Sequence, residues 1–101
     1  MGKLEGKVAI ITGGGKGIGF GLAKAFAKEG ANLTITGRTM SRLEAAKEKL
    51  EAEYGVKVLP ITADGADEAS VANVVKQTVE TFGHIDTVVN NAQVSKSGVM
   101  L

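Results

Sequence analysis

The stretch Lys7–Gly19, KVAIITGGGKGIG, decides the fold because it changes abruptly from an apolar run to a cluster of glycines. Lys7–Thr12, KVAIIT, is short and rich in β-branched residues, which predicts a buried strand. Thr12–Gly19, TGGGKGIG, lies where this strand meets the helix that follows. Helix N-termini present unpaired N–H groups and a positive dipole end, so glycines there let a phosphate approach the backbone closely. The junction predicts a phosphate cradle for a nucleotide, and a merely flexible turn is the alternative.

The rest of the chain alternates between strand and helix periodicity. Strand patterns recur at Asn32–Thr36, Val56–Ile61 and Ile85–Asn90, and helical patterns separate them. Such alternation is typical of βαβ units with right-handed crossovers and helices on the faces of a parallel sheet. Pro60 favours an edge position, or the last residues of its strand, because proline has no N–H to donate.

Three helices are expected, each ending before a glycine at Gly30, Gly55 or Gly83. Their apolar faces are predicted at Ile18, Leu22, Ala25 and Phe26, then at Leu43, Ala46, Leu50 and Tyr54, and last at Val71, Val74, Val75, Val79 and Phe82. Ser41 and Glu44 have the spacing of a capping box, which predicts the start of the second helix. Asp67 is the predicted cap of the third helix.

Composition excludes several classes of protein. Lys and Arg total 12 against 11 Asp and Glu, so no strong field of one sign indicates a nucleic acid or membrane partner. The chain of 101 residues has no cysteine, which excludes disulfides and thiolate metal sites. The early apolar run Val8–Ile11 is too short for a signal peptide or a membrane span. A single cytoplasmic domain without a metal site is therefore expected.

The glycine spacing excludes two common nucleotide motifs. A P-loop needs Ser or Thr after its lysine, but Gly17 follows Lys16. The pattern G-x-G-x-x-G is absent as well. The observed spacing, Gly13-x-x-x-Gly17-x-Gly19, resembles the T-G-x-x-x-G-x-G motif of the short-chain dehydrogenase/reductase family. The segment FGHIDTVVNNA resembles the fourth-strand segment of that family, and Asp64 matches its acidic residue after the third strand.

The resemblance implies a Rossmann-type, doubly wound parallel sheet with four strands in the order 3-2-1-4. It also implies an enzyme that transfers hydride between a nicotinamide cofactor and a small carbonyl or alcohol substrate, in a homo-oligomer when complete. The cofactor contacts that it implies are Gly13, Gly15, Lys16, Gly17, Ile18, Gly19, Asp64, Gly65, Asn90 and Ala92. Asp64 has an alternative role as a turn or cap residue, and Asn90 as a tie between backbone segments. Gln93 departs from the usual glycine of the family, which restricts close approach there.

Arg38 indicates which nicotinamide cofactor is bound. Folds that prefer NAD place an Asp or Glu at the end of the second strand, where this chain has Thr36-Gly37-Arg38. An arginine offers a planar fork of donors to the additional phosphate of NADP. Lys16 could add a second positive charge. The prediction is NADP(H) rather than NAD, and the alternative is that both side chains are solvated surface charges.

The catalytic residues that the resemblance implies are not found in this sequence. The family uses a Tyr-x-x-x-Lys pair and a Ser, but Tyr54 is the only tyrosine and Val58 stands four residues later. Ser95 and Ser97 follow the fourth strand too closely to be the serine, and His84 is read as a surface residue. We expect residues 1–101 to be a dinucleotide-binding segment, with the catalytic part beyond Leu101. The alternatives are a non-catalytic NADP(H)-binding module and an interaction module that uses the edge of the fourth strand.

Overall fold

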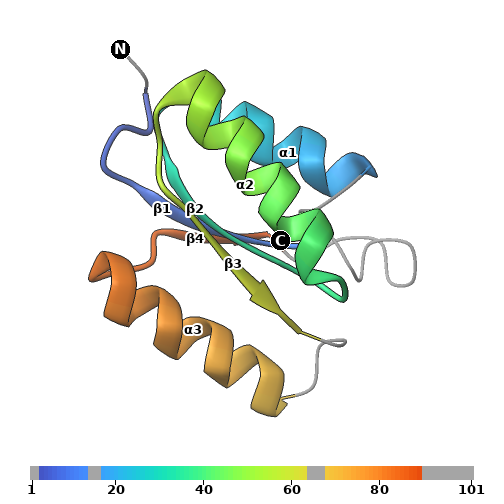
Figure 1. Ribbon diagram of the computed structural model, residues 1–101. Helices are drawn as coiled ribbons and strands as arrows, with labels where there is room; N and C mark the ends of the chain where they lie inside the picture. Colours follow the sequence, from blue (N-terminus) through green and yellow to red (C-terminus); the bar gives the residue numbers. More distant parts are fainter. Residues whose placement is uncertain (1–2, 14–16, 64–67, 90–101) are drawn as a thin grey trace.

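Strands and helices alternate through residues 3–13, 17–63 and 68–89, which are the residues that a computed structural model describes (Figure 1). The elements are β1 (Val8–Thr12), α1 (Gly17–Lys28), β2 (Asn32–Gly37), α2 (Met40–Tyr54), β3 (Val58–Thr62), α3 (Glu68–Phe82) and β4 (Thr87–Val89). Gly30, Gly55 and Gly83, which follow the three helices, have positive φ. The predicted alternation and the predicted helix ends are confirmed.

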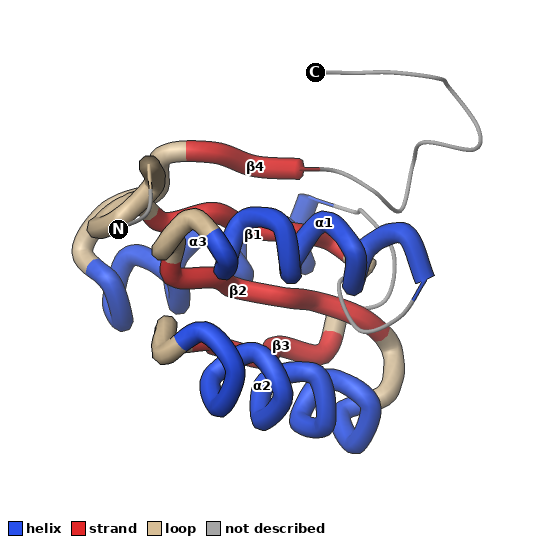
Figure 2. Tube along the Cα trace, turned by 90° about the horizontal axis from the view of Figure 1, so that it is seen from above, coloured by secondary structure: helices blue, strands red, loops and turns tan. Residues whose placement is uncertain are grey.

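The four strands form one parallel sheet in the order β3-β2-β1-β4, as predicted. Pro60 lies in the edge strand β3, where a missing N–H is tolerated. β4 is the other edge, seen as the outer strand in Figure 2. It begins at Thr87, two residues later than predicted, because Ile85 packs beneath the sheet and contacts the cluster around Ile10. Asn90 lies outside the described residues.

Alternate residues of the strands face opposite layers of helices. Ala9 and Ile11 pack with α1 and α2, whereas Ile10 between them packs with Val74 of α3. Figure 1 shows α1 and α2 on one face of the sheet and α3 on the other. The crossover from β3 to β4 runs back past β2 and β1, so a right-handed connection places α3 on the second face.

The buried face of α1 differs from the prediction. Gly19, Ala23 and Ala27 are buried, whereas Ile18 and Ala25 are exposed. Small residues let the helix approach the sheet closely, and Leu22 and Phe26 then pack at the sides of the contact. The prediction missed this face because it was based on the large apolar side chains of the helix, whereas its buried residues are small.

The start of α2 also differs from the prediction. The N-cap is Thr39, with extended backbone and no hydrogen bond from its side chain, and the helix begins at Met40. Ser41 therefore lies inside the first turn, and the predicted capping box is wrong. The predicted apolar face is confirmed, since Leu43, Ala46 and Leu50 are buried against the sheet.

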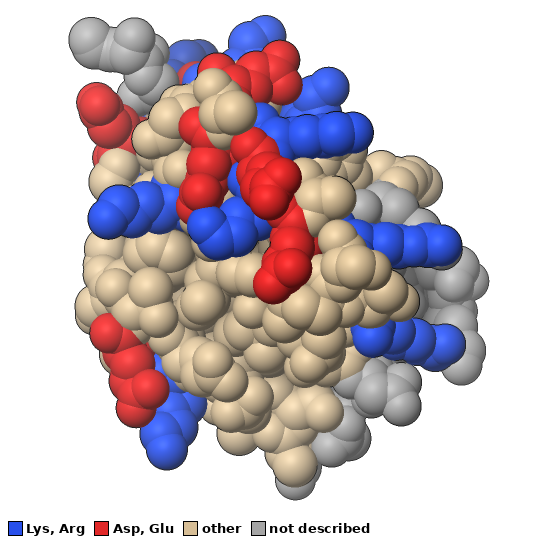
Figure 3. Space-filling view, viewed as in Figure 1, with Lys and Arg blue, Asp and Glu red and all other residues tan. Residues whose placement is uncertain are grey.

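The valine stripe of α3 is only partly buried. Val74 is buried, but Val71, Val75 and Val79 are 46%, 38% and 42% exposed. Figure 3 shows the surface over β3 and α3 as largely uncharged, while acidic and basic side chains crowd over α2. Of the predicted apolar stripe, Val74 is therefore the buried valine, and Thr78 is buried beside it on the same face of the helix. Asp67, the predicted cap, lies outside the described residues. No helix in the described part of the chain is long and apolar enough to cross a membrane.

A buried pair of threonines joins α3 to the middle of the sheet. The hydroxyls of Thr34 on β2 and Thr78 on α3 lie 2.9 Å apart, and both side chains are fully buried. The Thr78 hydroxyl also donates to the Val74 carbonyl at 2.7 Å. A hydroxyl has one hydrogen, so Thr34 must be the donor between the two threonines. The Thr34 hydroxyl therefore needs Thr78 as its acceptor, whereas the Thr78 hydroxyl donates to Val74 whether or not Thr34 is present.

We predict that the two threonines respond unequally to replacement by valine. Thr78→Val should lower the free energy of unfolding by about 1–3 kcal/mol, because the buried Thr34 donor loses its acceptor. Thr34→Val should lower the free energy of unfolding by a smaller amount. The double variant should be more stable than Thr78→Val alone, because it no longer contains the unpaired Thr34 donor. Chemical denaturation of the purified proteins measures this, with the exposed Thr62→Val as a matched control. Equal costs for the two single variants would contradict the assigned direction of the bond.

A second tie joins the beginnings of β1 and β4. The Val8 N–H donates to Oδ2 of Asp86 at 2.8 Å, and the Asp86 N–H donates to the Val8 carbonyl at 2.9 Å. His84 Nε2 lies 2.9 Å from the same Oδ2. The pKa of Asp86 is lowered from its ordinary 3.8, chiefly by the hydrogen bond from the Val8 N–H, which outweighs the opposing effect of desolvation, and His84 and Lys7 lower it further by smaller amounts. His84 is exposed, as predicted.

The lowered pKa of Asp86 predicts a dependence of stability on pH. The unfolded chain binds this proton more readily, so the stabilisation is complete above pH 3.8 and is lost as pH falls through the folded-state pKa. Asp86→Asn should therefore be less stable than the parent protein at pH 7, with a difference that narrows in acid. His84→Gln should keep most of the effect, because the Val8 N–H is the main cause. Urea titrations at pH 7 and below pH 3 compare the three proteins, and loss of the whole effect in His84→Gln would refute this account.

Candidate functional site

The candidate site lies at the carboxyl ends of β1 and β4, where the strand order reverses. β1 is followed in sequence by β2 on one side, while its neighbour on the other side is β4. Ligands of open α/β sheets bind in the crevice outside the carboxyl ends at such a point. The Thr12 hydroxyl donates to the Val89 carbonyl at 3.4 Å, which joins the ends of β1 and β4.

Gly13 and Gly17, on either side of residues 14–16, are the described glycines between β1 and α1. Gly13 and Gly17 have φ of 70° and 61°, a region that other residues rarely adopt. A Cβ added at Gly17 would meet no described atom within 4 Å. α1 begins at Gly17 and has no acidic residue in its first turn. This N-terminus suits an anionic group such as a diphosphate, so the residues present fit the predicted cofactor.

Of the two predicted contacts in the first turn of α1 that follow Gly17, one is buried and the other is exposed. Gly19 is buried under the first turn of α1, where it allows close packing on the sheet. Ile18 is 76% exposed and presents apolar surface next to the turn. A ligand lying along the turn would cover this side chain. Gly15 and Lys16, which the sequence also predicts as contacts, lie outside the described residues.

Arg38 lies at the same edge of the sheet as the glycine turn. Thr12 and Thr36 are partners in the parallel register, so Arg38 follows the end of β2 just beyond the end of β1. Its side chain is exposed, and the first turn of α2 beside it contains Arg42 and no acidic residue. Figure 3 shows basic side chains projecting at this end of the molecule. Two exposed arginines thus lie close together in sequence where β2 joins α2.

Several predicted contacts fall outside the described residues. Asp64 and Gly65 follow β3, and Asn90 and Ala92 follow β4, so the structure tests none of them. Their strands end at the same edge, since the Ala63 N–H donates to the Gly37 carbonyl at 2.8 Å and Val89 lies beside Ile11. The described part brings together Gly13, Gly17, Ile18, Gly19 and Arg38 around one edge. Within that part, no His, Cys, Asp and Glu side chains group in a way that could hold a metal ion.

Two residues at this edge were not singled out from the sequence. Arg42 lies in the first turn of α2 because that helix begins at Met40, a boundary that the predicted cap at Ser41 obscured. Gly37 lies against Leu43, since a Cβ at Gly37 would come 3.2 Å from Leu43 Cδ2. Both residues could have been found by interpreting the segment GRTMSRL, residues 37–43, as a single turn that joins β2 to α2.

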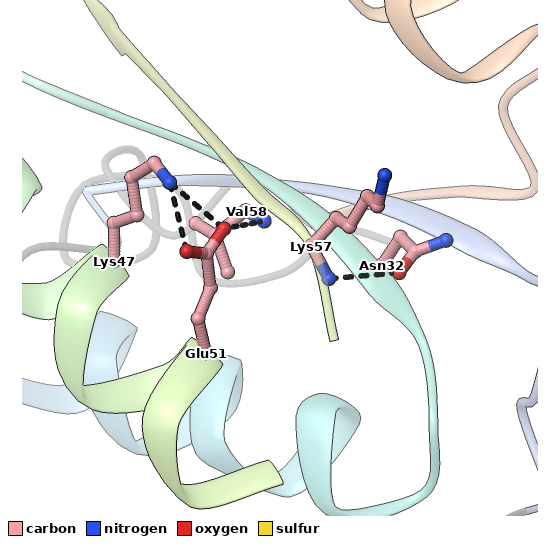
Figure 4. A network of polar contacts seen from close by, with 5 residues as sticks. All are labelled: Asn32, Lys47, Glu51, Lys57 and Val58. Carbon is pink, nitrogen blue, oxygen red and sulfur yellow. Dashed lines mark hydrogen bonds and ion pairs between the residues drawn. The ribbon is translucent and has the colours of Figure 1, made fainter. Parts of the chain in front are cut away.

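Polar contacts join α2, β2 and β3 at the amino ends of these strands. Glu51 of α2 accepts hydrogen bonds from Lys47 Nζ at 2.8 Å and from the Val58 N–H at 3.0 Å (Figure 4). Asn32 Oδ1 accepts the Lys57 N–H at 3.0 Å. The pKa of Glu51 is lowered, chiefly by the hydrogen bond from Lys47, against a smaller opposing effect of burial. These contacts fix the amino ends of β2 and β3, while the carboxyl ends carry the open turn.

Known proteins are similar to this chain in both fold and sequence. The model of the family described as short chain dehydrogenase matches residues 7–101. A 12α-hydroxysteroid dehydrogenase from Clostridium sp. is 53% identical over 107 aligned positions, which cover 100% of this chain and 41% of that protein. The structure of L-sorbose reductase from Gluconobacter frateurii, complexed with NADPH and L-sorbose, gives a TM-score of 0.84 at 43% identity, covering 90% of this chain and 34% of its own.

A third protein gives the same result. The alcohol dehydrogenase from the archaeon Thermococcus sibiricus, complexed with 5-hydroxy-NADP, gives a TM-score of 0.76 at 39% identity over 81% of this chain and 35% of its own. The chain thus spans about two fifths of the hydroxysteroid dehydrogenase and about a third of the reductase and alcohol dehydrogenase structures. The matched residues include the glycine turn, all four strands and all three helices, so the chain belongs to the short-chain dehydrogenase family.

Proposed function

We propose that this chain is the cofactor-binding segment of an NADP(H)-dependent oxidoreductase of the short-chain dehydrogenase type. The enzyme transfers hydride between the nicotinamide and the carbonyl or alcohol carbon of a small substrate. The observation that carries the proposal is the exposed Arg38 just after β2, at the same ends of the strands as Gly13 and Gly17.

Charge at the end of β2 supports NADP(H) over NAD(H). A carboxylate there would accept hydrogen bonds from the ribose hydroxyls and repel a 2′-phosphate. This chain has Thr36, Gly37 and Arg38 instead, and Thr36 is buried. The guanidinium can donate two parallel hydrogen bonds to a phosphate. Two of the similar structures contain NADPH or a modified NADP, which agrees with this choice.

The remaining proposed contacts are those that the resemblance to the family implies. The diphosphate would lie on the backbone of the turn and the first N–H groups of α1, with Lys16 adding a positive charge. The full set of proposed contacts is Gly13, Gly15, Lys16, Gly17, Ile18, Gly19, Arg38, Asp64, Gly65, Asn90 and Ala92. In this pose Asp64 and Gly65 contact the adenine, and Asn90 and Ala92 border the nicotinamide side.

The cofactor, when bound, supplies or accepts the hydride, and this chain binds and orients it. Reduction of a carbonyl also needs a proton on the oxygen. The sequence contains no Tyr-x-x-x-Lys pair, so we assign that proton transfer to the part of the complete protein that residues 1–101 do not span. We further propose a cytoplasmic homo-oligomer that acts on a small molecule.

A second candidate is an NADP(H)-binding or interaction module without turnover. The exposed valines of α3, together with Val88 of the edge strand β4 at 57% exposure, favour it because such apolar surface is typical of a contact region. Tight NADPH binding by the complete protein, with no oxidation of NADPH across a panel of carbonyl compounds, would select this candidate over the enzyme.

We predict that Arg38→Asp selectively weakens NADPH binding. Loss of a charge-assisted contact and addition of a negative charge should raise the dissociation constant for NADPH about tenfold to a hundredfold, with little change for NADH. Calorimetric titration at fixed salt measures both cofactors. Lys49→Asp, an equal charge change at an exposed position of α2, is the matched control. Equal losses for NADPH and NADH would refute the role of Arg38.

We predict that Gly17→Val weakens both cofactors alike. Valine resists the positive φ at this position, and its side chain would project into the space above the turn. The expected loss is about tenfold or more for NADPH and for NADH. Gly6→Val is the matched control, since Gly6 also has positive φ and open space but lies before β1, at the other edge. Similar losses in both variants would show a general effect of backbone strain rather than a cradle at Gly17.

A further inference from the structure

β3 is an outer strand of the described sheet, so one side of its backbone pairs with β2 and the other side faces outward. The carbonyl of Lys57, just before β3, accepts the Leu33 N–H of β2 at 2.9 Å. The N–H of Ala63, just after β3, donates to β2 at 2.8 Å. Backbone groups alternate in direction along a strand, so every second residue from 57 to 63 points to β2. The residues of β3 whose backbone points outward are Val58, Pro60 and Thr62.

Two of these three outward positions do not offer an N–H to another strand. Pro60 has no N–H. The Val58 N–H already donates to Oε2 of Glu51 at 3.0 Å, and the Glu51 side chain reaches it from α2 (Figure 4). Lys47 Nζ lies 2.8 Å from both oxygens of the same carboxylate and so holds it in place. The outer side of β3 is therefore a poor template for pairing.

The sequence of β3 would otherwise favour pairing between identical chains. Residues 56–62, VKVLPIT, are apolar or β-branched apart from Lys57 and Pro60. Segments of this kind that lack proline form intermolecular sheets when they lie at the edge of a sheet. The surface over β3 and α3 is also largely uncharged (Figure 3), so repulsion between charges on that surface would not keep two copies apart.

We propose that Glu51 and Pro60 prevent β3 from pairing with a second copy of this chain. A strand that approached the outer side of β3 would find no N–H at Pro60 and an occupied N–H at Val58. It would also have to displace the Glu51 carboxylate, or bury it together with Lys47. These side chains are 33% and 35% exposed, so their burial would remove water from both charges at a cost in free energy. Hydrogen bonding and charge thus close the same strand to self-association.

The test compares the full-length parent protein with Glu51→Ala, Pro60→Val and the double variant by sedimentation velocity over a range of concentrations. Each single change restores one N–H to the outer side of β3. At a given concentration, the double variant should contain about tenfold more of a species larger than the parent, and each single variant a smaller excess. Amide hydrogen exchange at positions 58 and 60 of the double variant should slow as its concentration rises, because these N–H groups then pair with the second copy.

Glu51→Gln and Glu48→Ala are the matched controls, and both should keep the size of the parent. Glu51→Gln retains an oxygen that can accept the Val58 N–H, and Glu48→Ala removes an exposed carboxylate from the same helix. If Glu48→Ala associates as strongly as Glu51→Ala, loss of negative charge alone explains the association and the proposal is wrong.

A merely structural role of Glu51 and Pro60 gives a different result. Larger species would then form only with loss of the helical circular dichroism signal, and they would not dissociate on dilution. That outcome would overturn the proposal, and so would a double variant that keeps the size of the parent at every concentration. If the double variant does not fold, Pro60→Val alone decides by the same sedimentation and exchange measurements.

Discussion

The reversal of strand order at β1 is the constraint on which the rest of the structure depends. β1 pairs with β2 on one side and β4 on the other, and right-handed crossovers then require helices on both faces. The reversal separates the connections that leave β1 and β4, and so opens a crevice at their carboxyl ends. The glycine turn and the N-terminus of α1 border that crevice because α1 follows β1 directly.

The amino and carboxyl ends of the strands have different roles. At the amino ends, Asp86 accepts a hydrogen bond from the first residue of β1. Glu51 and Asn32 accept hydrogen bonds from the first residue of β3 and from the residue before it. At the carboxyl ends, Gly13 and Gly17 have positive φ, and Arg38 and Arg42 are exposed. A sheet fixed at one edge can present backbone N–H groups at the other without losing its register.

Sequence reasoning predicted the alternation of strands and helices, because period-two strands, helical periods and glycine positions are local signals that agree with one another. The strand order was predicted from the resemblance to the short-chain dehydrogenase/reductase family. Sequence reasoning did not predict which faces are buried. An apolar stripe shows that one side of a helix can be buried, but Val75 stays exposed where the sheet does not reach it. The 3.2 Å approach at Gly37 could not be predicted either, since it depends on where α2 begins and on the rotamer of Leu43.

The central claim is that the basic end of β2 recognises the 2′-phosphate of a nicotinamide cofactor. The most direct measurement is the dissociation constant of the unmodified protein for NADPH and for NADH, determined side by side at the same ionic strength. The account predicts that NADPH binds at least about tenfold more tightly, which corresponds to about 1.4 kcal/mol from the phosphate. Equal affinities, or tighter binding of NADH, would contradict it.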